Sequence, residues 1–214
     1  MGSEIRENIA KRAAQEIDNG MIVNLGIGIP SLVPNYLKNK PQVMIQAENG
    51  ILGIGPTPLQ GEEEETLCNA AGYPVTLEKG ASYFDTATAF GMIRRGCIDL
   101  TILGSLQVSE NGDLANWIVP GKRVPGMGGA MELAGKAKKV IVVMNHVNKN
   151  GDPKILTSCT LPLTSKQCVD LIITDMAVIE VQKTGLILKE VMAPFTVQDV
   201  MKSTGAKLEI GMNL

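Results

Sequence analysis

The chain has 214 residues, of which 44% are hydrophobic, and its 20 basic residues nearly balance its 22 acidic ones. This length and composition suit one compact domain that buries a substantial core. Because the net charge is −2 and the aromatic residues are only 3 Phe, 3 Tyr and 1 Trp, we expect no nucleic-acid partner and no aromatic stacking platform for bases or sugars.

The N-terminal segment predicts a surface helix and no targeting signal. Isoleucine and alanine recur at helical spacing over residues 5–17, with charged residues between them, and Asp-Asn-Gly at 18–20 ends the pattern. The apolar stretch of a secretory signal is missing, and Arg6 stands where a myristoylation motif needs Ser or Thr. Since no apolar run of the chain approaches about 18 residues, we expect a cytoplasmic protein with no membrane partner.

Strands and helices are predicted to alternate through the first part of the chain. The pattern predicts a strand at "MIVNL" (21–25), a tight loop at "GIGIP" (26–30) and a short helix at "SLVPNYLKN" (31–39), which Ser31 can cap. A second buried strand follows at "VMIQA" (43–47). This order is typical of α/β architecture.

The middle of the chain predicts a helix, a strand and a hairpin. An acidic run at 62–65 suits an exposed loop, and after it a helix is predicted over 84–96 and a strand over 98–104. Alternating residues in 106–117 flank Asn111-Gly112, a dipeptide that favours a type I′ turn.

The last third completes the predicted domain. Its expected elements are a glycine loop with a short helix (124–137), a buried strand (139–145), a hairpin turning near Gly185 (177–191), a helix (196–204) and an edge strand (207–210). No linker or supersecondary repeat interrupts the chain. We therefore predict a single α/β domain over 1–214, with a mixed, mainly parallel central sheet flanked by helices.

The cysteines and the one histidine do not form a metal site. Cys68, Cys97, Cys159 and Cys168 lack CxxC spacing, and His146 alone cannot complete a usual zinc ligand set. We predict that the cysteines are reduced and buried. We expect no metal.

One carboxylate occupies an unusual place. In "QAENGILGIGP", Glu48 follows a predicted buried strand, and Asn49-Gly50 allows a sharp turn directly after it. Binding and catalytic groups of α/β sheets collect at such strand ends. The same tripeptide recurs at Glu110 in the predicted hairpin, where its polar neighbours predict an exposed turn. Glu110 therefore shows what a Glu-Asn-Gly with only a turn function would look like.

Three glycine-rich segments, "GIGIP", "ENGILGIGP" and "GMGGAMEL", adjoin core elements. Glycine lets backbone N–H groups approach a ligand closely, so such loops can bind phosphate or stabilise an oxyanion. The first segment does not match a dinucleotide-binding fingerprint, because Ser31 replaces the third glycine of GxGxxG.

Six motifs together resemble one family. "VNLGIGIP", "QAENGILGIGP", "GASYFDTATAFGMIRRGCIDLTILG", "NGDLANW", "VPGMGGAMEL" and "HVNKNG" are similar, in order and spacing, to the β subunit of family I coenzyme A transferases of the 3-oxoacid and acetate/butyrate–acetoacetate type. In that family the acid of Glu-Asn-Gly is the nucleophile, which here falls on Glu48. The family usually has Ser where this chain has Ala47, and Asp is common where it has Glu132.

The resemblance implies a ping-pong reaction through a glutamyl-CoA thioester, with coenzyme A as a substrate and no cofactor. Glutamate suits this role because its carboxylate is ionised at neutral pH and needs no neighbouring base, so His146 is not expected to take part. We expect the N–H groups of Gly128, Gly129 and Ala130 to form the oxyanion hole and to contact CoA.

Four further residues complete the predicted substrate site. Asn49 and Gly50 flank the nucleophile, while Gly26 and Gly28 either contact substrate or form only the tight turn below Glu48. Which of these two roles the glycines have is open.

The resemblance also implies a partner. Family members combine two similar halves, so we expect an α subunit that supplies much of the CoA site, in an α2β2 assembly that serves ketone-body or short-chain fatty acid metabolism. Two alternatives remain: a sugar-phosphate isomerase-like enzyme that uses the acid as a base, and a non-catalytic subunit of a CoA-ester enzyme. The acyl donor and acid acceptor are not defined by the sequence.

Overall fold

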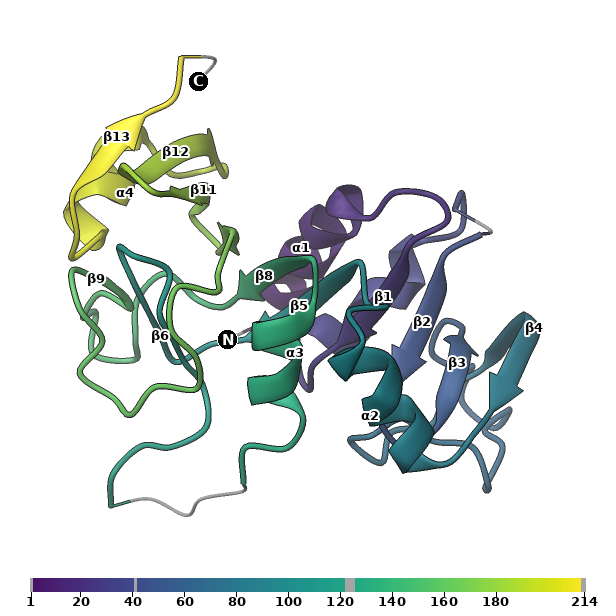
Figure 1. Cartoon of the computed structure of the whole chain (residues 1–214). Helices are drawn as coiled ribbons and strands as arrows, with labels where there is room; N and C mark the ends of the chain where they lie inside the picture. Colours follow the sequence, from purple (N-terminus) through teal and green to yellow (C-terminus); the bar gives the residue numbers. More distant parts are fainter. Residues whose placement is uncertain (1, 41, 122–125, 213–214) are drawn as a thin grey trace.

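A ten-stranded mixed sheet runs through the computed structural model, which describes residues 2–40, 42–121 and 126–212 (Figure 1). The strand order is β13-β12-β11-β10-β8-β5-β1-β2-β3-β4. The central strands are parallel: β10 (Leu171–Ile173), β8 (Lys139–Val143), β5 (Leu100–Gly104), β1 (Ile22–Leu25) and β2 (Met44–Ala47). The predicted fold class is confirmed.

Antiparallel strands extend the sheet at both ends. Beyond β2 lie β3 (Ile51–Ile54) and β4 (Leu77–Tyr83), and beyond β10 lie β11 (Ala177–Gln182) and β12 (Gly185–Val191). The final strand β13 (Leu208–Ile210) is an edge strand, as predicted, and it pairs parallel with β12.

Helices cover both faces of the sheet, and each face has its own apolar core. The first core includes α1 (Ser3–Ala13) and the 3-10 helices η1 (Ala14–Glu16) and η2 (Pro30–Tyr36), and the second includes α2 (Thr86–Arg94), α3 (Ala130–Lys136) and α4 (Val197–Ser203). Strand β8 shows why both form: Ile141 and Val143 enter the first core, and Val140 and Val142 enter the second. Strands buried on both faces read as continuous apolar runs.

A small second sheet has the order β7-β6-β9, with β7 (Leu114–Ala115), β6 (Gln107–Ser109) and β9 (Ile155–Leu156). The hairpin β6–β7 forms as predicted. The prediction of a type I′ turn is wrong, because that turn needs a positive φ at both central residues, and Gly112 has φ +80° whereas Asn111 does not have a positive φ. The N–H of Gly112 donates to Ser109 O, and the N–H of Ser109 donates to Asp113 O. This is a three-residue loop that ends in a left-handed glycine.

Several local predictions need correction. The predicted helix at 31–39 is the 3-10 helix η2, which ends at Tyr36 and contains Pro34. Ser31 does not cap it, because its hydroxyl donates to Gly28 O at 2.7 Å. Residues 51–54, predicted as loop, form β3. Gly53, with φ +96°, allows this strand to approach Ala81 of β4 closely.

The short strands β9 and β10 were not predicted. They have 2 and 3 residues, which is too short for a periodic pattern. Of the predicted glycine loop at 124–137, Val124 and Pro125 lie outside the described residues.

Cys68 and Cys97 are exposed and Cys159 and Cys168 are partly buried, so the predicted burial of the cysteines was wrong. Each is a free thiol, and none of them lies in a helix or strand. Across the described ranges, no helix combines the length and apolar character needed to span a membrane.

Candidate active site

Glu48 lies in a tight turn between β2 and β3. The N–H of Gly50 donates to Ala47 O at 3.1 Å, and Ala47 pairs with Ile51 across the hairpin. Gly50 has φ +114°, and a Cβ on it would lie 2.0 Å from Phe84 O, so only glycine fits this position. The carbonyl oxygen of Glu48 accepts a hydrogen bond from the Thr86 hydroxyl at 2.8 Å. The turn therefore fixes the backbone of Glu48 at the carboxyl end of a parallel strand.

The second Glu-Asn-Gly adopts the same kind of three-residue loop in different surroundings. Glu110 is partly buried, not exposed as its polar neighbours suggested, and its N–H donates to Leu156 O. It does not line the pocket that Glu48 reaches. The tripeptide Glu-Asn-Gly thus specifies the turn. The neighbouring strands decide that Glu48 lines the pocket and that Glu110 does not.

A buried amide adjoins the Glu48 carboxylate. Asn24 on β1 is 1% exposed, and its Nδ2 donates to Glu48 Oε2 at 3.4 Å. The same nitrogen donates to the side-chain and backbone oxygens of Gln46 at 2.6 and 3.1 Å. Gln46 in turn donates to Ala89 O of α2 at 3.3 Å. This network connects the carboxylate to two parallel strands and a helix.

Sequence reasoning missed Asn24 and Gln46. Their signal was a polar residue inside each of the apolar strands "MIVNL" and "VMIQA", and the two residues are partners in the β1–β2 register. A buried polar side chain needs a hydrogen-bonded partner, which here is the neighbouring strand and Glu48.

One of the predicted oxyanion-hole residues, Gly129, lies beside the other carboxylate oxygen. A Cβ built on Gly129 would lie 3.6 Å from Glu48 Oε1 and 3.5 Å from the Phe90 ring. The Ala130 N–H already donates to Met127 O at 3.4 Å. The N–H groups of Gly128 and Gly129 donate to no group within the described part of the chain. The geometry therefore favours these two amides of the three.

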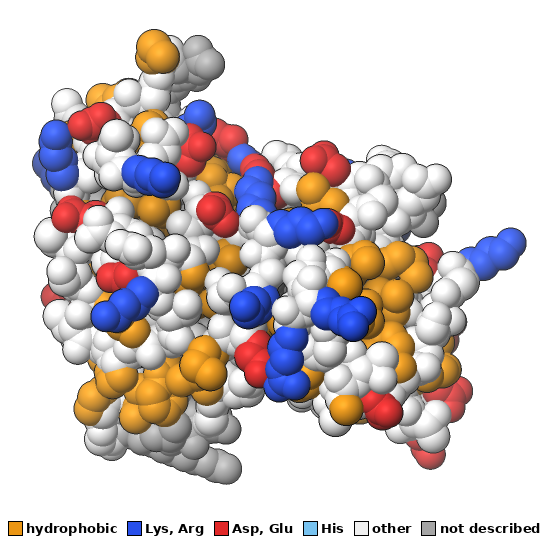
Figure 2. Space-filling model, viewed as in Figure 1, with side chains coloured by type: hydrophobic (Ala, Val, Ile, Leu, Met, Phe, Trp, Pro, Cys, Tyr) orange, Lys and Arg blue, Asp and Glu red, His pale blue; other side chains and the backbone are white. Residues whose placement is uncertain are grey.

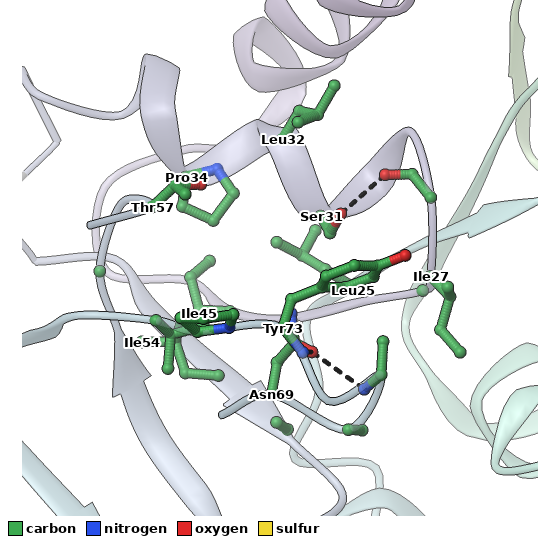
Figure 3. Close-up of a pocket in the computed structure, with 18 of the residues that line it drawn as sticks. Leu25, Ile27, Ser31, Leu32, Pro34, Ile45, Ile54, Thr57, Asn69 and Tyr73 are labelled. Carbon is green, nitrogen blue, oxygen red and sulfur yellow. Dashed lines mark hydrogen bonds between the residues drawn. The ribbon is translucent and has the colours of Figure 1, made fainter. Parts of the chain in front are cut away.

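A pocket of about 420 Å³ opens between η2, the carboxyl ends of β1 and β2, and the 57–75 loop (Figure 3). Gly26, Gly28 and Glu48 are among its lining residues. Its size is within the usual range for small-molecule sites.

The remaining predicted residues have mainly backbone roles. The Gly26 N–H donates to Ile102 O at 2.8 Å, and Gly28 has φ +94° in the turn before η2. The exposed Asn49 donates from Nδ2 to Cys68 O at 2.8 Å. Asn49 thereby ties the 57–75 loop to the Glu48 turn, and Gly50 shapes that turn.

In ranges 2–40, 42–121 and 126–212, no three His, Cys, Asp or Glu side chains cluster in a way that could hold a metal. The acidic residues 62–65 lie exposed in a loop, as predicted.

His146 follows β8, which is three strands from β2 in the sheet order, and is fully buried. Its Nδ1 contacts the Thr174 hydroxyl at 3.0 Å and its Nε2 the Thr204 hydroxyl at 2.9 Å. Burial lowers the pKa of His146 to about 4, although Asp175 partly opposes this effect and Lys154 adds to it. The ring joins the end of β10 to the end of α4, which is a structural role.

A pH-dependent stability follows from this histidine. Unfolded, His146 regains a pKa near 6.5, so between pH 6.5 and about 4 the unfolded chain binds a proton that the folded chain does not. Its contribution to the unfolding free energy should be complete above pH 6.5 and decline by about 3 kcal/mol as the pH falls to 4.

Urea unfolding at pH 7 and pH 4.5 measures this decline. His146→Gln should lose stability at pH 7, show a smaller decline, and transfer CoA within about tenfold of the wild-type rate per folded molecule. An equal decline in both proteins, or a thousandfold loss of activity, would contradict this assignment.

Comparisons with known proteins identify the family of this chain. The family model described as "Coenzyme A transferase" matches residues 6–203. A "Probable coenzyme A transferase subunit beta" of Bacillus subtilis is 65% identical over 99% of this chain and 98% of its own. A mitochondrial succinyl-CoA:3-ketoacid coenzyme A transferase 2A of Rattus norvegicus is 50% identical over 98% of this chain and 41% of its own.

A solved structure shares the fold at low sequence identity. The acyl-CoA transferase apoenzyme of Escherichia coli O157:H7 superposes with a TM-score of 0.80 at 19% identity, covering all of this chain and 43% of that one. The chain thus spans 98% of the Bacillus subunit and less than half of the rat and Escherichia coli chains.

Proposed function

The chain belongs to the coenzyme A transferase family, and from this we propose that it is the catalytic subunit of an enzyme that moves CoA between an acyl-CoA and a small carboxylic or 3-oxo acid, with Glu48 as the nucleophile. One observation carries the proposal. The two oxygens of Glu48 lie in different surroundings: Oε2 next to the Asn24 amide, and Oε1 next to Gly129.

The first half-reaction loads CoA onto the enzyme. Oε1 attacks the carbonyl carbon of the acyl-CoA, the carbon–sulfur bond breaks, and an acyl-glutamyl anhydride and a CoA thiolate result. The thiolate attacks the glutamyl carbonyl carbon and expels the acid as a carboxylate, which leaves a glutamyl-CoA thioester. A second carboxylate reverses these steps, and no net proton is transferred.

The neighbours of Glu48 support each addition. Negative charge develops on the substrate carbonyl oxygen in the first attack. We assign the Gly128 and Gly129 N–H groups as its donors, because Gly129 lies beside Glu48 Oε1. Charge develops on a glutamyl oxygen when the thiolate attacks, and the Asn24 amide is positioned to donate to it. An oxyanion-hole donor of this kind contributes roughly 3 kcal/mol.

The proposed partner is a second, α-type subunit in an α2β2 complex. The Bacillus relative is named as a subunit, and the rat enzyme is more than twice as long as the part that this chain matches. Large apolar side chains are exposed near the site, including Ile27 at 64%, Tyr73 at 56% and Met131 at 53%. Figure 2 shows apolar side chains gathered in patches on one face of the molecule. A partner that covers such side chains would also close the site to water.

The purified chain alone should therefore transfer CoA at less than a tenth of the rate of the reconstituted complex, because its CoA site is incomplete. Chromatography of the acyl-CoA product follows transfer from an acyl-CoA to acetate or acetoacetate, and initial rates over both concentrations should follow ping-pong kinetics. Full activity of the isolated chain would contradict the shared site, and sequential kinetics would contradict the covalent intermediate.

The succinyl-CoA and 3-ketoacid specificity in the rat enzyme's name suggests that this chain also acts in ketone-body metabolism. The isomerase alternative needs a phosphate site beside the acid, and the only cation that lines the Glu48 pocket is Arg6, within the described residues. A non-catalytic subunit would not need a turn that admits only Gly50 beside a hydrogen-bonded carboxylate.

A further inference from the structure

Three buried polar side chains form a row across adjacent strands of the sheet. Gln46 of β2, Asn24 of β1 and Thr101 of β5 are each at most 1% exposed, and the strand register pairs Asn24 with both of the others. The three strands lie side by side (Figure 1). Polar groups are costly to bury without partners, so each member of this row needs a specific explanation.

The row lies on the face of the sheet that α2 covers. Gln46 reaches the Ala89 carbonyl of α2, and Leu103, two residues after Thr101, belongs to the second core, which includes that helix. Alternate residues of a strand point to the same face, and register partners on parallel strands share a face. Thr101 and Asn24 are therefore neighbours on the α2 side.

The surroundings of Asn24 allow its amide only one orientation. Its Nδ2 faces three acceptors, which are the side-chain and backbone oxygens of Gln46 and Oε2 of Glu48. A flipped amide would place Oδ1 against these three oxygens, where no hydrogen bond could form. Asn24 Oδ1 is therefore directed away from Glu48, and this buried acceptor needs a donor of its own.

Two oxygens of the row have no hydrogen-bond partner among residues 2–40, 42–121 and 126–212. These are Asn24 Oδ1 and Thr101 Oγ1, and both are buried. Adjacent strands are about 4.8 Å apart, so the two register partners are close, although their oxygens do not bond directly. Buried polar groups at such a separation are typically bridged by an ordered water. A water can donate to Asn24 Oδ1 and also bond to the Thr101 hydroxyl, which is both donor and acceptor.

We propose that Thr101 is a positioning residue that acts on Glu48 through one bound water and the Asn24 amide. The proposal rests on the proposed function of Glu48. The water donates to Asn24 Oδ1, which keeps Nδ2 directed at Glu48 Oε2 and strengthens its N–H as a donor, because hydrogen bonds in a chain polarise one another. A donor held in this orientation can shorten its 3.4 Å contact when charge develops on the glutamyl oxygen.

Removal of the Thr101 hydroxyl in the reconstituted complex tests this positioning role. Thr101→Val keeps the shape of the side chain and should lower kcat about tenfold per folded molecule, which is less than the loss of an oxyanion donor itself costs. KM for the acyl-CoA should change by less than about twofold, because the fully buried Thr101 contacts no substrate. Thr101→Ser keeps the hydroxyl and should stay within about threefold of the wild-type kcat.

Stability separates positioning from a merely structural role. Thr101→Ser leaves a methyl-sized void in the core, so it should unfold at a lower urea concentration than Thr101→Val, which only replaces a hydroxyl by a methyl group. The expected order of stability is thus the opposite of the order of kcat. If kcat follows stability instead, the proposal is wrong. Thr101→Ala also removes the hydroxyl, and wild-type turnover of this variant would contradict the proposal even if Thr101→Val did not fold.

Thr174→Val is the matched control. Thr174 is also fully buried, directly after β10, but its hydroxyl contacts His146. This variant should lose stability and keep kcat per folded molecule within about twofold. A tenfold loss here would show that any buried threonine of the sheet affects turnover, and the assignment of Thr101 would fail.

A double-mutant cycle checks that Thr101 acts through Asn24. Asn24→Ala should lower kcat at least about thirtyfold, and in that background Thr101→Val should lower it further by less than about twofold. An equal tenfold loss in both backgrounds, or no loss from Asn24→Ala, would overturn the proposal. A crystal structure of the complex should show one water within about 3.2 Å of both oxygens. No water at that position would overturn the proposal as well.

The CoA thioester on Glu48 of the wild-type complex tests the proposed function separately. If this thioester forms and Thr101→Val turns over at the wild-type rate, only the role of Thr101 is refuted. If no thioester forms on any residue while transfer proceeds, the proposed function itself is wrong.

Discussion

Glu48→Gln is expected to lower the rate of CoA transfer by at least about a thousandfold, or more than 4 kcal/mol in transition-state free energy. An amide is too weak a nucleophile to attack a thioester, while its size is that of the carboxylate. The loss should appear in kcat and much less in KM, because the distant contacts of the nucleotide lie elsewhere and provide most of the binding energy. Steady-state kinetics of the complex with butyryl-CoA and acetoacetate measure both constants.

Glu110→Gln is the matched control for this loss. Glu110 occupies the same tripeptide in the same kind of three-residue turn, yet it lines no part of the pocket beside Glu48. Its substitution should leave kcat within about twofold, because Gln keeps the size of the side chain and no step of the proposed reaction uses Glu110. Near-normal turnover of Glu48→Gln would show that the acid is only a turn residue.

Gly50→Ala should inactivate the enzyme without changing any reacting group. The new Cβ would lie 2.0 Å from Phe84 O, and the backbone has φ +114°, so the turn that carries Glu48 must move. Misplacement of a catalytic group by about 1 Å can cost a hundredfold in rate. We expect at least that loss per folded molecule, and a decrease of about 3 kcal/mol or more in the unfolding free energy.

Gly20→Ala separates the effect of strain from that of the clash. Gly20 also has a positive φ, of +86°, but a Cβ there meets nothing within 4 Å. This variant should lose only about 1 kcal/mol of unfolding free energy and keep full activity. If Gly50→Ala behaved like Gly20→Ala in urea unfolding and in turnover, the turn would not be the element that positions Glu48.

The sequence predicted the elements whose pattern is local. The helix at residues 5–17, the strands around residues 22, 45, 101 and 141, and the hairpin at Gly185 follow from periodicity and turn residues, and the structure confirms them. The resemblance of six motifs indicated the family, which the comparisons confirm. The role of Glu48 stays a prediction.

The parts that sequence reasoning did not reach depend on long-range contacts. Pairing of Asn24 with Gln46 requires the β1–β2 register, and the position of Gly129 near Glu48 requires α3 to pack beside the carboxyl end of β2. The strand β3 was not predicted, because it lies in a glycine-rich segment that indicated a loop. Its glycines Gly53 and Gly55 allow close packing against β4 and the adjoining Thr76. Sequence reasoning excluded His146 from the reaction but did not predict its full burial, which depends on packing beside Thr174 and Thr204.

The most direct measurement is to map the covalent intermediate. The reconstituted complex is incubated with butyryl-CoA and no acceptor acid, digested under mildly acidic conditions, and its peptides are weighed by mass spectrometry. CoA should be found on one glutamate, in the peptide that contains Glu48, and it should disappear when acetoacetate is added. The peptide with Glu110 should stay unmodified. CoA on Glu110, on another residue, or on no residue while transfer proceeds would contradict Glu48 as the nucleophile.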